Sequence, residues 1–174
     1  AAMLLAACQA QLRSQLLSGL PLATAMARVN TDLHQRSEAS KFVTLIAGIV
    51  DTASRVIHLA DAGHGLSVHA PRDSSPFRIE TEPGFPLGVV ESADYEVMRL
   101  NPEPGSSMVL FSDGAVEQAN PQGVQFGLRG SLDCLAAARG QDELVEGLLE
   151  GVRNYAAGPL ADDLTVAAVW IESA

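Results

Sequence analysis

The spacing of the apolar residues changes twice along this chain, and that change limits the fold more than any other feature of the sequence. Near the N-terminus apolar residues recur at the spacing of a helix face. The middle of the chain instead carries short apolar runs, rich in β-branched residues, which are typical of strands. Helical spacing then returns, before one last apolar run. The predicted helices are 1–18, 21–36, 128–139 and 142–157.

The predicted strands favour two antiparallel sheets. Their residues are 42–50, 55–60, 66–70, 95–100, 107–112 and 164–171, with a short edge strand at 77–79. The run 42–50 is so continuously apolar that we expect a central strand there. Short strands that follow one another closely favour antiparallel pairing. With helices in pairs at the two ends of the chain, the fold class is α+β, with helices packed outside a sheet core.

Composition limits the partners more than the chemistry. A chain of 174 residues has the length of one domain, and no linker divides it. The net charge of 11 − 21 = −10 argues against nucleic acid or an anionic membrane as the partner. No apolar run reaches the roughly 18 residues of a membrane span. Cys8 and Cys134 lack paired spacing, so we expect buried thiols and a reducing, cytoplasmic location.

The helical pattern is already running at Ala1-Ala2-Met3, with no capping residue before it. A domain seldom starts in the middle of a helix. We therefore expect this sequence to be an N-terminally truncated piece of a longer domain.

Two acidic sites lie at the ends of predicted strands. Asp113-Gly114 follows the strand 107–112, and Asp162-Asp163 precedes the strand 164–171. Carboxylates held at the ends of neighbouring strands can share one Mg²⁺ or Mn²⁺ ion, since hard cations prefer oxygen ligands. Each site alone has an ordinary alternative. Asp-Gly is common in hairpin turns, and Asp-Asp after Gly-Pro is common in solvated loops.

Other catalytic motifs are missing from the sequence. It contains no GxSxG, GxxxxGK[ST], HExxH or CxxC pattern. The four histidines show no zinc-ligand spacing. His58 and His69 fall within predicted strands, where we expect packing or surface roles.

The order of several segments resembles a known family. In sequence order these are KFVTLIAGIVD, LADAGHGLSV, GFPLGVV, MVLFSDGAVEQAN, QFGLRGSL and ADDLTVAAVW. Each segment is modest alone, but their joint order from residue 41 onward resembles the SpoIIE-like branch of the PPM family, the metal-dependent serine/threonine protein phosphatases. The helices at 1–36 also resemble the pair that follows this family's first metal-binding turn.

The resemblance implies an α-β-β-α sandwich of two antiparallel sheets flanked by helix pairs. It also implies a dinuclear Mn²⁺ or Mg²⁺ centre in the complete domain, where the metal-activated water attacks phosphorus and no further catalytic residue is needed. Asp113 and Asp162 correspond to metal ligands, and Gly114 and Asp163 are weaker candidates. The family's first strands and first metal-binding turn are expected to precede Ala1. We therefore expect this piece alone to be inactive.

Residues 61–65 need a separate interpretation. Asp61-Ala62-Gly63-His64 stands where the family usually has Asn-Ala-Gly-His, and Ser112 replaces the commoner Thr. The segment is also similar to an Asp-Gly-His-Gly metal signature. That signature leads into a long helix, however, whereas 66–70 has the pattern of a strand. We therefore predict a hairpin turn at 61–65 and no metal-ligand role for Asp61.

Two functions remain open at this point, beside the possibility of an unrelated sheet-and-helix module with Asp-Gly turns. The first is a phosphatase acting on phosphoserine or phosphothreonine of a regulatory protein, an anti-sigma-factor antagonist by resemblance, with a sensor or receiver domain upstream. The second is a non-catalytic phosphatase-like domain that binds a partner in sigma-factor or stress signalling. Exposed sheet edges would favour a homodimer in either case.

Overall fold

The computed structural model describes residues 2–36 and 41–172, and the chain divides into two compact units. The first unit comprises Ala1–Gly65 and Glu80–Asn101, and the second comprises Leu66–Ile79 and Pro102–Ala174. The chain therefore passes between the units three times. Each unit contains its own antiparallel sheet and its own helix pair.

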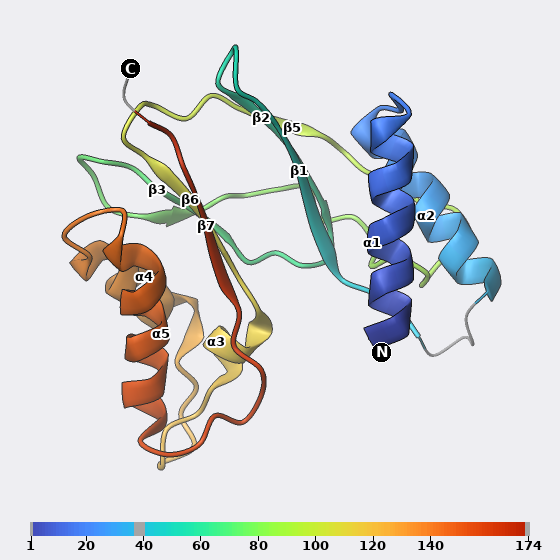
Figure 1. Ribbon diagram of the computed structural model, residues 1–174. Coiled ribbons are helices and arrows are strands. Elements are labelled where there is room, and N and C mark those ends of the chain that lie inside the picture. Colours follow the sequence, from blue (N-terminus) through green and yellow to red (C-terminus); the bar gives the residue numbers. More distant parts are fainter. Residues whose placement is uncertain (1, 37–40, 173–174) are drawn as a thin grey trace. The chain divides into compact units, whose positions relative to one another are not determined.

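The first unit begins with two helices. They are α1, Ala2–Leu17, and α2, Leu22–Arg36, which lie side by side and run in opposite directions (Figure 1). Gly19 lies between them with a φ of 86°, a left-handed conformation that glycine adopts without strain. The sheet has the strand order β1-β2-β5, with β1 at Leu45–Asp51, β2 at Val56–Ala62 and β5 at Met98–Leu100.

The core of the first unit explains why its second helix forms where it does. Leu22, Met26, Val29 and Leu33 recur every three or four residues along α2, and all four are buried. They pack with Ala60 and other apolar residues of the sheet in one cluster. Among residues 3–17 of α1, only Cys8 and Leu12 are buried, while Met3, Leu5 and Leu17 are exposed.

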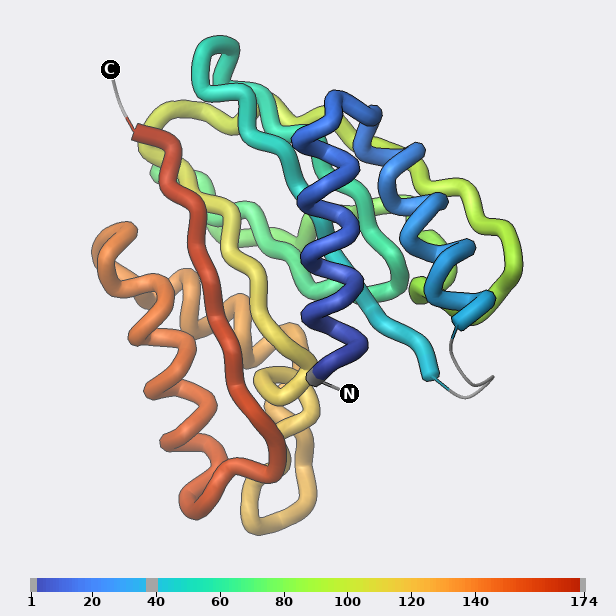
Figure 2. The backbone as a smooth tube through the Cα atoms, turned by 45° about the vertical axis from the view of Figure 1, so that its right-hand side comes forward, coloured from blue at the N-terminus to red at the C-terminus, as the bar shows by residue number. Residues whose placement is uncertain are grey.

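The second unit has the strand order β4-β3-β6-β7, with every pair antiparallel. Its strands are β3, Ser67–Ala70; β4, Phe77–Arg78; β6, Ser107–Phe111; and β7, Val166–Trp170. Its helices are α3, Asp113–Glu117; α4, Gly127–Ala137; and α5, Glu143–Ala156. In Figure 2, β6 and β7 run next to each other along their whole length.

The second core lies between this sheet and the helices α4 and α5. Leu144, Leu148 and Val152 form the buried stripe of α5 and pack with Val109 and Phe111 of β6. The two helices approach closely at Gly151, where a Cβ would overlap the Cys134 sulfur. Both cysteines are free thiols, and burial raises the pKa of each. Cys8 is buried as predicted, whereas Cys134 is only partly buried.

The structure confirms the α+β class, the four long helices and the antiparallel pairing, with shifts of a few residues at most element ends. The prediction of a central strand at 42–50 is wrong. Within the described residues β1 begins at Leu45, lies at one edge of its sheet and pairs with β2 alone. Ile49 and Val50 are exposed beside the turn at Asp51. A β-branched run reports strand propensity, and it does not establish burial on both faces.

Three other details differ from the prediction. Residues 61–65 are not a hairpin turn, because β2 and β3 belong to different sheets and the segment carries the chain from one sheet to the other. The strand expected at 95–100 is shorter and begins at Met98. Asp113-Gly114 opens the short helix α3, which the sequence did not indicate. No helix in the described part of the chain has both the length and the apolarity to cross a membrane.

Candidate functional site

The end of β6 and the start of β7 bring the two predicted acidic segments together within the second unit. The last pair of the ladder is Phe111 and Val166, so Ser112-Asp113 leaves β6 beside the segment that enters β7. Ser112 continues the pairing beyond the strands. Its backbone N–H donates to the Thr165 carbonyl at 2.9 Å, and its Oγ accepts from the Thr165 N–H at 3.0 Å.

The Ser112 side chain also ties the two segments at a second point. Its Oγ donates to the carbonyl of Asp163 at 3.1 Å. Through these contacts the backbone before Asp113 is joined to the backbone after Asp162. From the sequence, Ser112 stood out only as a replacement for the commoner Thr. Its position directly after a predicted strand could have indicated this structural role, since a hydroxyl next to a strand end can hydrogen-bond to the neighbouring backbone.

Gly114 lies tightly against the second segment. The residue is buried, and a Cβ built on it would overlap the backbone carbonyl of Asp163. Only glycine fits at this position without moving the Asp162-Asp163 segment. Because Gly114 has no side chain, α3 can pack directly against the segment that precedes β7.

The carboxylates at this edge have oxygens available to a cation. Asp113 Oδ1 accepts from the Gly114 N–H at 3.0 Å, and Asp162 Oδ1 accepts from the Asp163 N–H at 2.7 Å. The side chains of Asp113, Asp162 and Asp163 are all exposed. Within residues 2–36 and 41–172, no Lys or Arg forms an ion pair with them, and the second oxygen of Asp113 and of Asp162 accepts no hydrogen bond.

This donor set fits a hard divalent cation in kind. Mg²⁺ and Mn²⁺ prefer carboxylate oxygens, and a carboxylate without an ion pair is stabilised by a nearby cation. The set of ligands is small. The described residues contain no group of three or more His, Cys, Asp or Glu that could hold a metal ion. The distance between the Asp113 and Asp162 carboxylates stays a prediction, at roughly 7 Å or less.

Asp61, in the first unit, has different surroundings. It is 1% exposed, and its carboxylate accepts three hydrogen bonds. The donors are the backbone N–H of His64 at 2.7 Å, the backbone N–H of Gly65 at 2.9 Å and Thr81 Oγ1 at 2.9 Å. These contacts hold the turn after β2 to the segment that returns to the first unit. Asp61 therefore has a structural role that does not require a metal.

Comparisons with known proteins cover nearly the whole chain. A family model described as Stage II sporulation protein E (SpoIIE) matches residues 1–172. The phosphoserine phosphatase RsbU of Bacillus subtilis (strain 168) is 27% identical over 101 residues, which are 58% of this chain and 30% of RsbU. The chain thus matches less than a third of the length of that relative.

Solved structures show the same fold. The PP2C phosphatase domain of SpoIIE from Bacillus subtilis, solved with a fragment of its regulatory domain, superposes with a TM-score of 0.81 at 23% identity. That superposition covers 95% of this chain and 48% of the other. The SpoIIE phosphatase domain presoaked with Mn gives a TM-score of 0.66 at 23% identity, over 94% and 71% of the two chains.

Proposed function

The chain belongs to the SpoIIE family of PP2C-type phosphatases, and from that premise we propose that it hydrolyses phosphoserine or phosphothreonine on a regulatory protein, using Asp113 and Asp162 as ligands of a Mn²⁺ or Mg²⁺ ion. The observation that supports this most is the meeting of two unpaired carboxylate segments at the shared end of β6 and β7. The similarity to a phosphoserine phosphatase supports the substrate class. The manganese presoak of a SpoIIE domain supports the choice of metal.

The proposed reaction adds water across the phosphate ester. The bond between phosphorus and the ester oxygen breaks, and inorganic phosphate and a free hydroxyl side chain are released. A bound divalent ion supplies positive charge for the phosphoryl oxygens and lowers the pKa of a coordinated water. Asp113 and Asp162 would hold the ion. Ser112 and Gly114 keep the two segments in register, and Asp163 is a weaker candidate ligand.

The regulatory setting is also part of the proposal. The substrate is a phosphorylated anti-sigma-factor antagonist, and a sensor or receiver domain in the same polypeptide controls the phosphatase. The regulatory domain of the SpoIIE relative supports this arrangement. We place the protein in the cytoplasm and include a homodimer among its assemblies.

The test is phosphate release from a phosphoserine protein by the full-length polypeptide that carries this sequence. We expect turnover with Mn²⁺, none with EDTA, and a loss of about 100-fold or more in Asp113→Asn and Asp162→Asn, because charge neutralisation at the phosphoryl group depends on the metal. Asp163→Asn should lose less. The matched control is Asp133→Asn, an exposed aspartate on α4 away from the strand ends.

The alternative function is a phosphatase-like domain that binds a partner without catalysis. It is consistent with the described residues, which contain no group of three potential metal ligands. A full-length protein that binds its phosphorylated partner without releasing phosphate would be a partner-binding domain. Wild-type turnover in both Asp113→Asn and Asp162→Asn, with folding unchanged by circular dichroism, would contradict the ligand assignment itself.

A further inference from the structure

The loop that carries Asp162 runs from the end of α5 to the start of β7, and most of it is exposed. Leu160 and Leu164 are partly buried against the second core. On the side of β7, the Ser112 Oγ joins the loop at two backbone positions. A ligand on a loop binds a cation well only when the loop is held in place, so the other side of Asp162 also needs an anchor.

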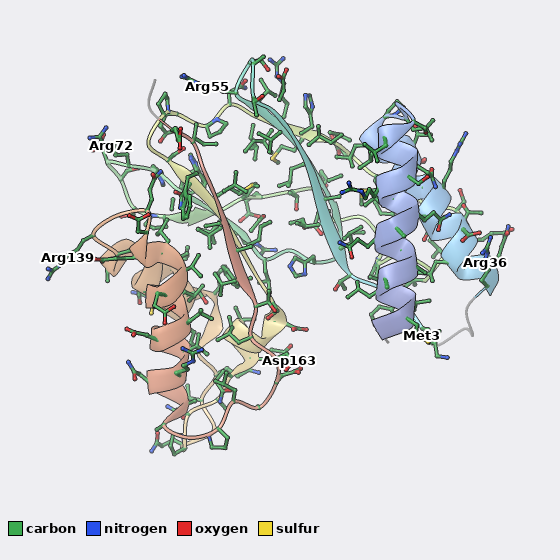
Figure 3. The ribbon with its side chains drawn as sticks, in the orientation of Figure 1. Met3, Arg36, Arg55, Arg72, Arg139 and Asp163 are labelled. Atoms are coloured by element: carbon green, nitrogen blue, oxygen red, sulfur yellow. The ribbon has the colours of Figure 1, made fainter. Side chains whose placement is uncertain are left out.

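Gln118 anchors the loop on that other side. Its side-chain Oε1 accepts a hydrogen bond from the Ala161 N–H at 2.9 Å, across 43 positions of sequence. Gln118 follows the last residue of α3 and is 6% exposed. Asp162 thus lies between a backbone group held by Gln118 and a backbone group held by Ser112. Figure 3 shows the next residue, Asp163, beside α3.

The amide of Gln118 is fixed in one orientation. Its Nε2 donates to the Ala119 carbonyl at 2.8 Å, while its Oε1 faces the Ala161 N–H. Exchanging the two amide atoms would place a donor against a donor and an acceptor against an acceptor, so only one orientation satisfies both contacts. The backbone of Gln118 is held as well, because its carbonyl accepts from the Phe126 N–H at 2.8 Å. This amide is therefore a rigid anchor.

Packing alone does not explain an amide at this position. An apolar side chain of similar length would fill the same space, whereas a buried amide is costly unless it is paired. One of its two partners is its own neighbour, and the other is the residue before Asp162. We propose that Gln118 is a positioning residue for the candidate metal ligand Asp162, acting through the Ala161 N–H. This inference rests on the proposed function, because it takes Asp162 to bind the ion.

The experiment compares Gln118→Met with the wild type in the full-length polypeptide that carries this sequence. Methionine has nearly the length of glutamine, but its thioether is only a weak acceptor for the Ala161 N–H. The Mn²⁺ dissociation constant is measured from the EPR signal of free Mn²⁺, without substrate. We expect Gln118→Met to weaken Mn²⁺ binding by about threefold to tenfold, less than the loss of a group that hydrogen-bonds a ligand directly.

Two further measurements separate positioning from a loss of folded protein. In EDTA, the peptide that contains Ala161 should exchange its amide hydrogens faster in Gln118→Met, because the Ala161 N–H has lost its acceptor. In phosphate release, the Mn²⁺ concentration for half-maximal activity should rise by the same factor as the dissociation constant. The rate at saturating Mn²⁺ should return to near the wild-type value.

Ser131→Ala is the matched control. Ser131 is fully buried on α4 in the same unit, and its Oγ donates to the Gly127 carbonyl at 3.2 Å. Neither residue belongs to the acidic segments. The variant should lower the melting temperature yet change the Mn²⁺ dissociation constant by less than about twofold. Weakening as large as in Gln118→Met would show a general effect of lost stability and overturn the proposal.

Asp162→Asn separates this proposal from the proposed function. If Asp162 is a ligand, Asp162→Asn weakens Mn²⁺ binding, and adding Gln118→Met has little further effect because the positioned carboxylate is already gone. Equal weakening by Gln118→Met in both backgrounds, or no weakening in either, would overturn the positioning role and leave the ligand assignment intact. Wild-type Mn²⁺ affinity in Asp162→Asn would contradict the ligand assignment, and this proposal with it.

Discussion

Asp61 and Asp113 each lie at the end of a strand, yet their carboxylates have opposite surroundings. Asp61 is buried with three donors, whereas Asp113 is exposed and accepts one hydrogen bond, from the next residue. We predict that Asp61→Ala lowers the free energy of unfolding by about 3 kcal/mol, because it leaves buried donors unsatisfied. Asp113→Ala should change it by less than about 0.5 kcal/mol.

Urea unfolding of the metal-free chain measures both effects. Asp61→Asn is the milder variant, since an amide oxygen can still accept some of the three hydrogen bonds, and it should lie between the wild type and Asp61→Ala. Equal destabilisation by the alanine variants of Asp61 and Asp113 would show that Asp61 does not have the structural role inferred for it.

The raised pKa of Tyr95 should make the free energy of unfolding depend on pH in the alkaline range. Burial raises the pKa of Tyr95 to about 12, and its hydroxyl donates to the Phe85 carbonyl at 3.0 Å. Between the unfolded pKa of about 10 and the folded value, the native state holds a proton that the unfolded chain has released. The stabilisation is complete below pH 10 and is lost as the pH rises toward 12.

In wild type the free energy of unfolding should therefore fall by about 1–2 kcal/mol between pH 9.5 and 11.5. Tyr95→Phe should remove most of that fall, although it also loses the hydrogen bond at neutral pH. Urea midpoints at several pH values measure the slope. A slope in Tyr95→Phe as steep as in wild type would assign the pH dependence to other groups.

At the scale of elements, the contact between α3 and the segment before β7 depends on Gly114. We predict that Gly114→Ala destabilises the chain by about 1–3 kcal/mol, because the new methyl group overlaps the Asp163 carbonyl and one segment has to move. The control is Gly147→Ala within α5, where nothing lies within 4 Å of the added Cβ. There alanine should stabilise by about 0.5–1 kcal/mol.

Thermal unfolding of the two variants measures this difference. In the full-length polypeptide, Gly114→Ala should also weaken the proposed Mn²⁺ binding, since it displaces Asp163 and its neighbour Asp162. Unchanged stability in Gly114→Ala would mean that the segment before β7 yields at little cost, and that Gly114 does not set the spacing of the two acidic segments.

The elements that the sequence predicted well are those with a strong local signal. The stripe of Leu144, Leu148 and Val152 has a spacing that only a helix satisfies, and α5 forms there. The run before Asp113 and the run after Asp163 predicted β6 and β7, and with them the place where the acidic segments meet. The edge position of β1 was not predictable in this way, because strand order depends on contacts distant in sequence.

The same limit applied to the sites. Asp113 and Asp162 could be selected from their places at strand ends, but the hydrogen bonds through Ser112 that join their segments depend on the register of β6 against β7. The prediction of a hairpin turn at 61–65 rested on the strand pattern of 66–70, and only the strand order shows that this strand and β2 belong to different sheets.

For the whole molecule, the two segments of the candidate metal site both belong to the second unit. That unit is not continuous in sequence, because Glu80–Asn101 returns to the first unit between its two parts. A truncation that removed one unit would therefore cut a covalent connection of the other. Tests of the candidate metal site therefore need the intact chain.

The metal affinity of the 174-residue chain follows from its count of ligands. Asp113 and Asp162 supply two carboxylates, and the described residues contain no group of three potential ligands. A hexacoordinate Mn²⁺ or Mg²⁺ bound there would keep about four waters, so we expect weak binding. We predict millimolar Mn²⁺ binding by calorimetry and little phosphate release from a phosphopeptide, because transition-state charge would be only partly neutralised. The comparison is the full-length polypeptide assayed under the same conditions, which should be much faster if it supplies further carboxylates. Equal metal-dependent turnover by the two proteins would mean that other residues of this chain complete the metal site.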